Sequence, residues 1–84
     1  MQLVFSPPAW ADYLHWQATD PKQVKRINLL IKEIVRDPFA GIGKPEALKH
    51  ALQGWWSRRI DGEHRIVYKV VGQQVWFAQL RYHY

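Results

Sequence analysis

Apolar side chains recur at helical spacing in two consecutive segments of the N-terminal half. The first helix is predicted over residues 7–17, because Ser6 can cap a helix that starts with two prolines. The second is predicted to start at Pro21, with Asp20 as its cap, and to end before Pro38. Its apolar stripe is the clearest periodic signal in the chain and consists of Val24, Ile27, Leu30, Ile31, Ile34 and Val35.

The rest of the chain shows the shorter apolar runs that are typical of strands. Residues 38–54 contain three glycines and two prolines, so they are expected to form a loop with one helical turn at 45–50. Turns are predicted at Asp61-Gly62 and at Gly72-Gln73. The strands between these breaks are predicted over residues 2–5, 55–60, 64–71 and 75–82.

The resulting order is β-α-α-β-β-β, which predicts one α+β domain over residues 1–84. The two N-terminal helices are expected to pack on one face of a mainly antiparallel, twisted sheet. The other face of that sheet is expected to be open to solvent.

Alternate side chains of a strand point to opposite faces, so the apolar positions predict the orientation of the others. The core side is assigned to Trp56, Ile60, Ile66, Tyr68, Val70, Trp76, Ala78 and Leu80. The outward side is assigned to Ser57, Arg59, Arg65, Val67, Lys69, Gln79, Arg81 and His83. Arg58 then falls on the inner side and is expected at the edge of the sheet. Three arginines and one histidine on the outward side predict an anion-binding face.

Positive charge is concentrated in the C-terminal half. The chain has a net charge of +5, and residues 43–84 carry seven Lys or Arg against three Asp or Glu. This asymmetry favours a polyanionic or acidic partner, although solubility alone also accounts for it. Neither a signal peptide nor a membrane-spanning stretch is recognisable, and cysteine is absent, so a cytoplasmic protein is expected.

A basic face of this kind suggests chemistry on a phosphodiester. Cleavage of RNA without a metal requires a base for the 2′-hydroxyl, a cation for the phosphorane and an acid for the 5′-oxygen. Arginine suits the cationic role, because its planar fork binds phosphate oxygens in pairs. His83 suits the acid role and is the only histidine placed beside the arginines, with an inert terminal histidine as the alternative. His64, on the core side, is expected to be a buried or edge histidine with satisfied hydrogen bonds, and His15, on the first helix, is expected to be structural or solvated.

Two further groups have alternative interpretations. Glu46 and Lys49 can act as base and phosphate ligand, or they can form an ordinary ion pair on a surface turn. Trp55 can stack on a nucleobase or belong to the core. Phosphate-loop, dinucleotide and zinc-ligand motifs are absent from the sequence, so no metal and no cofactor are expected.

Five sequence motifs together resemble one known family across essentially the whole chain. They are GKPE at residues 43–46, LKH at 48–50, GWWSRRI at 54–60, EHRIVY at 63–68 and the terminal RYHY at 81–84. In this order they resemble the YoeB branch of the RelE/ParE toxin superfamily. The resemblance implies a RelE-like fold and the toxin of a type II toxin–antitoxin system, which cleaves messenger RNA in the ribosomal A site and leaves a 2′,3′-cyclic phosphate.

The resemblance also implies roles for individual residues. Glu46 is expected to be the general base, Arg65 the phosphorane stabiliser and His83 the general acid, while Tyr84 orients the substrate. The phosphate contacts are expected to be Lys49 and Arg59, and Arg81 is added to them because it shares their predicted face.

The implied partners are the ribosome with its bound message, a second copy of the chain, and a YefM-type antitoxin whose disordered segment folds on binding. An acidic segment over a basic face is physically reasonable. Two other functions compete with the nuclease: a ParE-like toxin that poisons gyrase, and a module that binds RNA or antitoxin without catalysis. The presence of Glu46, Arg65 and His83 together favours the nuclease over both.

Overall fold

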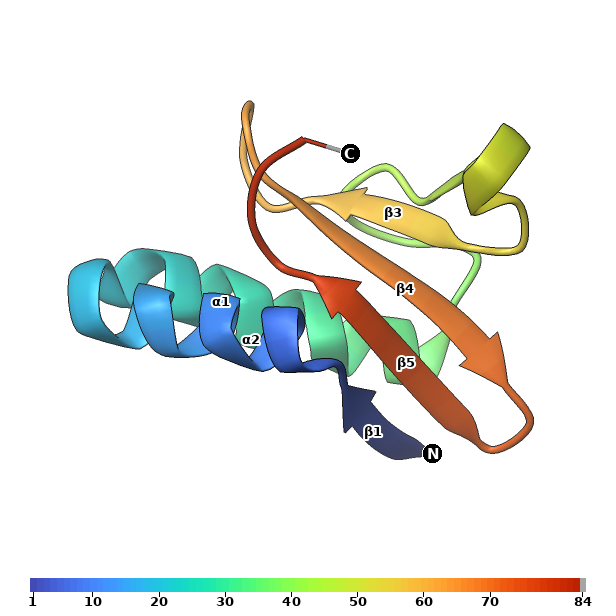
Figure 1. Ribbon diagram of the computed structural model, residues 1–84, viewed down its shortest axis with the longest axis horizontal. Coiled ribbons are helices and arrows are strands. Elements are labelled where there is room, and N and C mark those ends of the chain that lie inside the picture. The colour runs from blue at the N-terminus through green and yellow to red at the C-terminus, as the bar shows by residue number, and fades with distance from the viewer. Residues whose placement is uncertain (84) are drawn as a thin grey trace.

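A computed structural model of the chain describes residues 1–83 and shows two helices packed against a five-stranded sheet (Figure 1). The sheet has the order β1-β5-β4-β3-β2, in which β1 runs parallel to β5 and the other neighbours are antiparallel. The elements are β1 (Gln2–Phe5), α1 (Pro7–Thr19), α2 (Pro21–Arg36), β2 (Glu46–Ala47), η1 (His50–Leu52), β3 (Trp56–Arg59), β4 (Arg65–Val71) and β5 (Gln74–Gln79). The predicted α+β class and the mainly antiparallel sheet are confirmed.

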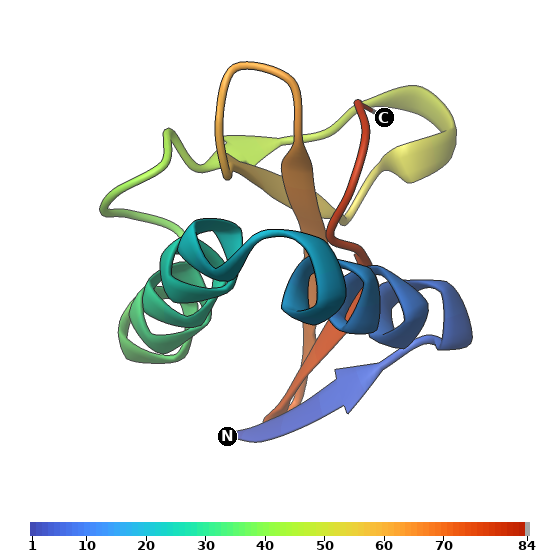
Figure 2. The ribbon, with the colours of Figure 1, turned by 90° about the vertical axis from the view of Figure 1, so that its left-hand side faces the viewer.

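Both helices begin where the sequence indicates. The Ser6 side chain accepts a hydrogen bond from the Ala9 amide, and the Asp20 carboxylate accepts from the amides of Lys22 and Gln23. Figure 2 shows the two helices side by side on one face of the sheet. Their buried residues join the sheet in one core of Ala9, Trp16, Ile27, Leu30, Ile31, Ile34, Ile60, Ile66, Tyr68, Val75, Phe77 and Leu80.

The predicted alternation fails in β5. Val75 and Phe77 are buried in the core, whereas Trp76 is 39% exposed and Ala78 lies outside the core cluster. The cause is a β-bulge, because Tyr68 pairs with Phe77 while the adjacent Val67 pairs with Gln79. One extra residue shifts the alternation by one position, so Leu80 reaches the core as predicted but Trp76 and Ala78 do not.

The segment between α2 and β3 also differs from the prediction. The helical turn expected at 45–50 is replaced by the two-residue strand β2 and, after it, the short helix η1. At the other end of the chain, β5 ends at Gln79 rather than at residue 82. The outer face of the sheet is not fully open, because Ser57 and Val67 are 2% exposed there. Val67 lies at the bulge between β4 and β5.

Arg58 has the predicted orientation toward the inner side of the sheet, in a strand that β2 pairs only at Trp56 and Ser57. Its side chain is 0% exposed, on the helix-covered face. Its guanidinium donates to the Tyr68 hydroxyl through Nε and to the backbone carbonyls of Asp37, Ala40 and Ile42 through the terminal nitrogens. Burial raises the pKa of Tyr68, although the hydrogen bond and charge of Arg58 act in the opposite direction. Arg58 thus fastens the segment after α2 to the sheet.

Within residues 1–83, the two helices are too short and too polar for a membrane span.

Candidate functional site

The candidate site lies on the outer face of the sheet, where three strands bring charged residues together. Arg59 of β3 pairs directly with Arg65 of β4, and two positions away Ser57 pairs with Glu46 of β2. Diagonal neighbours of this kind lie roughly 7–8 Å apart, within reach of long side chains. Like charges directly opposite each other are unfavourable in a sheet, so the arginine pair is suited to an anion that neutralises both.

Gly43 fixes the position of the strand that carries Glu46. The Gly43 carbonyl accepts a 2.7 Å hydrogen bond from the Arg59 amide, three residues before β2 begins. Its φ is +81°, and a β-carbon there would lie 2.9 Å from Leu30 and 3.2 Å from the Arg59 carbonyl. Only glycine allows this approach, so the GKPE motif ties the Glu46 strand to Arg59.

Glu46 itself is exposed and lies in extended backbone, not in the surface turn considered from the sequence. With Ala47, Leu48, Lys49, His50 and Leu52 it lines a hollow of ≈ 410 Å³. Lys49 is also exposed and follows directly after this strand segment. No ion pair between Glu46 and Lys49 occurs within the described residues, which leaves the carboxylate accessible to a ligand.

Arg65 is held in place by the turn that precedes it. Its side chain is only 8% exposed, and Nη1 donates to the backbone carbonyls of Asp61 and His64, at 2.9 and 3.1 Å. Both bonds come from one of the three guanidinium nitrogens. The Arg65 fork is therefore oriented by backbone atoms and does not depend on an acidic partner for its position.

Asp61 shapes that turn. Its carboxylate accepts from the amides of Glu63 and His64 and from Gln23 Nε2 of α2. Partial burial acts to raise the pKa of Asp61, but these hydrogen bonds and the nearby His64 outweigh it, so the pKa is lowered. The sequence indicated only a turn at Asp61-Gly62. The role of Asp61 in positioning Arg65 depends on its hydrogen bond with Gln23 of α2, and a contact between distant residues has no signal in the sequence.

The chain after β5 returns to the same place. The Arg65 amide donates to the Tyr82 carbonyl at 3.1 Å, which brings the following residue, His83, to the N-terminal end of β4. His83 is exposed, and Figures 1 and 2 both show the red segment after β5 turning back toward the yellow-green chain that precedes β3. Tyr84, the fourth residue expected at the site, lies outside the described residues.

The two remaining arginines of the predicted face differ in position. Arg59 is exposed beside Arg65. The guanidinium of Arg81 instead lies 4.6 Å from the Tyr82 ring and 6.0 Å from the ring of Trp16 in α1. Its Nε is buried without a hydrogen-bond partner. The contacts of Arg81 thus lie between the C-terminal segment and α1, and not with Arg59 and Arg65.

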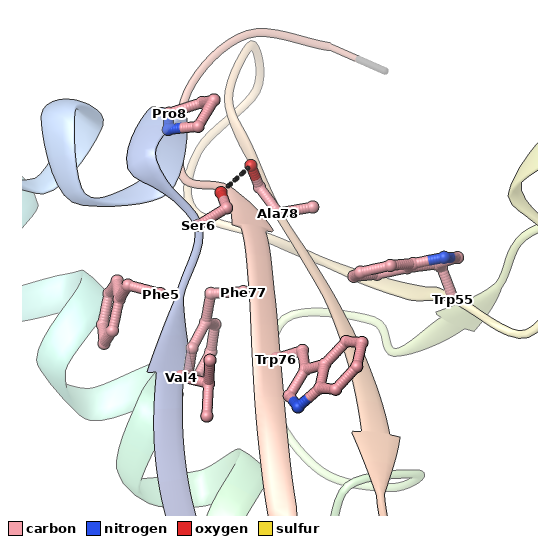
Figure 3. A pocket seen from close by; sticks show the side chains of 8 residues that line it. All are labelled: Val4, Phe5, Ser6, Pro8, Trp55, Trp76, Phe77 and Ala78. Carbon is pink, nitrogen blue, oxygen red and sulfur yellow. Dashed lines mark hydrogen bonds between the residues drawn. The ribbon is translucent and has the colours of Figure 1, made fainter.

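Trp55 lies outside the core cluster, so the core interpretation is not supported. It is half-buried, with Lys69 Nζ 5.8 Å from its ring centroid. Figure 3 shows Trp55 and Trp76 on two sides of an apolar hollow of ≈ 420 Å³. The other lining residues are Val4, Phe5, Ser6, Pro8, Phe77 and Ala78.

Comparison with known proteins identifies relatives that match over their full length. The chain is 55% identical to toxin YoeB of Streptomyces coelicolor and 56% identical to toxin YoeB of Escherichia coli K12, and each alignment of 84 residues covers 100% of both chains. Identity at this level over a whole domain indicates a shared family.

Solved structures agree with the sequence matches. The YoeB/ParE toxin from Agrobacterium tumefaciens has a TM-score of 0.96 at 50% identity, with 100% of both chains covered. Two Staphylococcus aureus structures, the heterotetrameric YoeB–YefM complex and the YoeB dimer, have TM-scores of 0.92 and 0.93 at 48% identity, covering 100% of this chain and 98% of theirs. The family model "YoeB-like toxin of bacterial type II toxin-antitoxin system" matches residues 5–84. The chain therefore belongs to the YoeB-like toxins of bacterial type II toxin–antitoxin systems.

Proposed function

We propose that this toxin is a ribosome-dependent endoribonuclease that cleaves messenger RNA in the A site without a metal ion. Support comes above all from the strand register, which places Arg59 opposite Arg65 on the outer face and Glu46 on the neighbouring strand. The hydrogen bond from the Arg65 amide to the Tyr82 carbonyl supports a place for His83 at the same end of the sheet. A base, a paired cation and an acid are the groups that transesterification of RNA requires.

In the proposed reaction, the Glu46 carboxylate removes the proton of the 2′-hydroxyl at the scissile nucleotide. The 2′-oxygen then attacks the adjacent phosphorus, and Arg65 stabilises the added negative charge on the phosphorane oxygens. His83 gives a proton to the leaving 5′-oxygen as the P–O bond breaks. The products are a 2′,3′-cyclic phosphate on one fragment and a 5′-hydroxyl on the other.

Other residues of the proposed site bind and do not react. Lys49 and Arg59, both exposed, contact phosphates on either side of the scissile bond. Arg81 adds positive charge beside the C-terminal segment, and Tyr84 orients the scissile nucleotide. The same basic face is proposed to bind the acidic, disordered segment of a YefM-type antitoxin, which then blocks access of RNA.

The assembly follows by analogy with relatives. A YoeB–YefM complex and a YoeB dimer are known from Staphylococcus aureus. We infer that the present toxin also forms a homodimer and a complex with its own antitoxin. A substrate held in the ribosomal A site implies that it acts in the cytoplasm.

Primer extension on a message programmed into purified ribosomes tests the activity. The wild-type toxin is compared with Glu46→Ala and His83→Gln at the magnesium concentration that intact ribosomes require. Wild type should cut at the A-site codon, and each variant should cut roughly 10²–10⁴-fold more slowly, the usual range for loss of a general acid or base. Binding to the ribosome should change far less than the cleavage rate.

The outcomes separate the competing functions. Absence of cuts from a well-folded wild type would exclude the nuclease, and inhibition of gyrase would then be measured. Cuts that persist in both variants would show that Glu46 and His83 are not the acid–base pair. Equal losses of cleavage and of ribosome binding in His83→Gln would reduce His83 to a binding residue.

A further inference from the structure

The C-terminal segment is held by contacts to α1 and to the start of β4. The indole of Trp16 donates to the Leu80 carbonyl at 2.9 Å, and the Leu80 amide donates to the Asp12 carboxylate at 3.0 Å. Both contacts come from α1 and fix the segment only as far as Leu80. The position of the next residues therefore depends on other contacts.

Tyr82 is held at both ends of its backbone by two consecutive residues. Its carbonyl accepts from the Arg65 amide at 3.1 Å, and its amide donates to Nδ1 of His64 at 2.8 Å. A ring nitrogen can accept only through its lone pair, so the bond requires a neutral imidazole with the hydrogen on Nε2. That nitrogen faces Glu63, whose Oε1 lies 3.5 Å away.

The backbone of Tyr82 needs this support. Its φ is +67°, in the left-handed region that residues with a β-carbon rarely adopt. The conformation turns the chain immediately before His83. Loss of the bond to His64 removes one of the two hydrogen bonds made by the Tyr82 backbone, and a return to extended backbone would displace His83.

The His64 ring is itself held in a defined orientation. It lies edge-to-face on Trp16, with ring centroids 4.8 Å apart. His15 also lies edge-to-face on the Trp16 ring, with centroids 4.9 Å apart, but it makes no bond to the C-terminal segment among the described contacts. The two histidines thus share a packing partner and differ in the hydrogen bond to Tyr82.

We propose that His64 is a positioning residue of the nuclease. Its Nδ1 accepts a hydrogen bond from the Tyr82 amide, and by holding Tyr82 it fixes the position of the next residue, His83, relative to Arg65. This inference rests on the proposed function, in which His83 is the general acid and Arg65 the phosphorane stabiliser. The adjacent residues His64 and Arg65 act together, because both hold Tyr82 and Arg65 also carries the stabilising guanidinium.

Two variants of nearly equal shape separate the hydrogen bond from packing. His64→Asn keeps an acceptor at the δ position, whereas His64→Leu has the same branched skeleton without one. Single-turnover cleavage on programmed ribosomes should fall by about 10- to 100-fold in His64→Leu, since a displacement of about 1 Å can reduce a rate 100-fold. His64→Asn should stay within about 5-fold of wild type, and ribosome affinity should be similar in all three.

His15→Ala is the matched control. It removes the other histidine ring that packs on Trp16 and should leave the single-turnover rate unchanged. Circular dichroism of each variant at the assay temperature ensures that only folded protein is compared. Equal rates for His64→Asn and His64→Leu, whether both high or both low, would overturn the proposed acceptor role.

A second measurement does not depend on cleavage. An N–H···N hydrogen bond transmits a scalar coupling between its two nitrogen nuclei, so ¹⁵N NMR of the wild type should show coupling between the Tyr82 amide and His64 Nδ1. Its absence under conditions where His64 is neutral would overturn the inference. If the wild type shows the coupling but cuts no message, the contact exists and the proposed nuclease function has failed.

Discussion

Arg58 on the helix-covered face of the sheet and Arg65 on the outer face are both shielded from solvent, at 0% and 8% exposure. All three nitrogens of the Arg58 guanidinium donate to protein acceptors, namely the Tyr68 hydroxyl and three backbone carbonyls. The two hydrogen bonds that position Arg65 both come from Nη1. The two arginines are therefore buried to a similar extent, but they differ in how many guanidinium nitrogens donate hydrogen bonds to the protein.

This difference indicates a structural role for the arginine on the helix-covered face and a ligand-binding role for the arginine on the outer face. Arg58 binds the segment that leaves α2, including the carbonyl of Asp37 at the C-terminal cap of the helix, where a cation is favoured by the helix dipole. Arg65 is oriented by two carbonyls of its own turn and points its charge toward the same face as Arg59. A shielded arginine whose donors are all bound to protein is structural, and one that is oriented through a single nitrogen is suited to a ligand.

Arg58→Met tests the structural side and should have the largest effect. The change leaves three partly buried carbonyls and the Tyr68 hydroxyl without their donor. The loss of these hydrogen bonds to a charged group should lower the free energy of unfolding by about 3–5 kcal/mol. Urea unfolding followed by tryptophan fluorescence measures it. The neighbouring exposed Arg59→Met is the matched control and should stay within about 0.5 kcal/mol of wild type. A decrease of less than about 1 kcal/mol in the free energy of unfolding of Arg58→Met would contradict the structural role of Arg58.

Arg65→Lys tests the outer face and should affect the reaction more than the fold. A lysine keeps the charge but not the planar fork, so single-turnover cleavage should fall by about 10²–10³-fold. The free energy of unfolding should fall by only about 1–2 kcal/mol, because only one of the two hydrogen bonds from Arg65 to the carbonyls of Asp61 and His64 is lost. Arg36→Lys, an exposed change on α2, controls for the substitution itself. A variant that keeps more than a tenth of the wild-type rate would show that the fork is not needed in the transition state.

The contrast between the two faces could be predicted from the sequence only in part. Both helices and the side-chain caps at Ser6 and Asp20 were predictable, because their signals are local. The inward orientation of Arg58 was predictable from alternation with Trp56 and Ile60. Its acceptors were not, because backbone carbonyls have no side-chain signature in the sequence.

The errors concern features that depend on pairing with distant residues. The bulge opposite Val67 shifted the alternation of β5, so Trp76 and Ala78 were wrongly assigned to the core. The two-residue strand β2 exists only because it pairs with β3, and no run of that length can be recognised in a sequence. The catalytic assignment of Glu46, Arg65 and His83 came from resemblance and stays a prediction; alternation indicated a shared face for the last two.

Arg59→Ala should have the smallest effect and addresses the part of the outer face that binds without reacting. If Arg59 neutralises one RNA phosphate, its loss should reduce the slope of log affinity against log salt concentration by about 0.7–1, for an RNA oligonucleotide or for programmed ribosomes. Affinity at low salt should fall by no more than about tenfold, since a single exposed ion pair contributes about 1 kcal/mol. Lys25→Ala removes the same charge from the exposed surface of α2 and should leave the slope unchanged. Equal slopes for both variants would mean that the net charge of the protein, and not the arginine pair on the sheet, governs RNA binding.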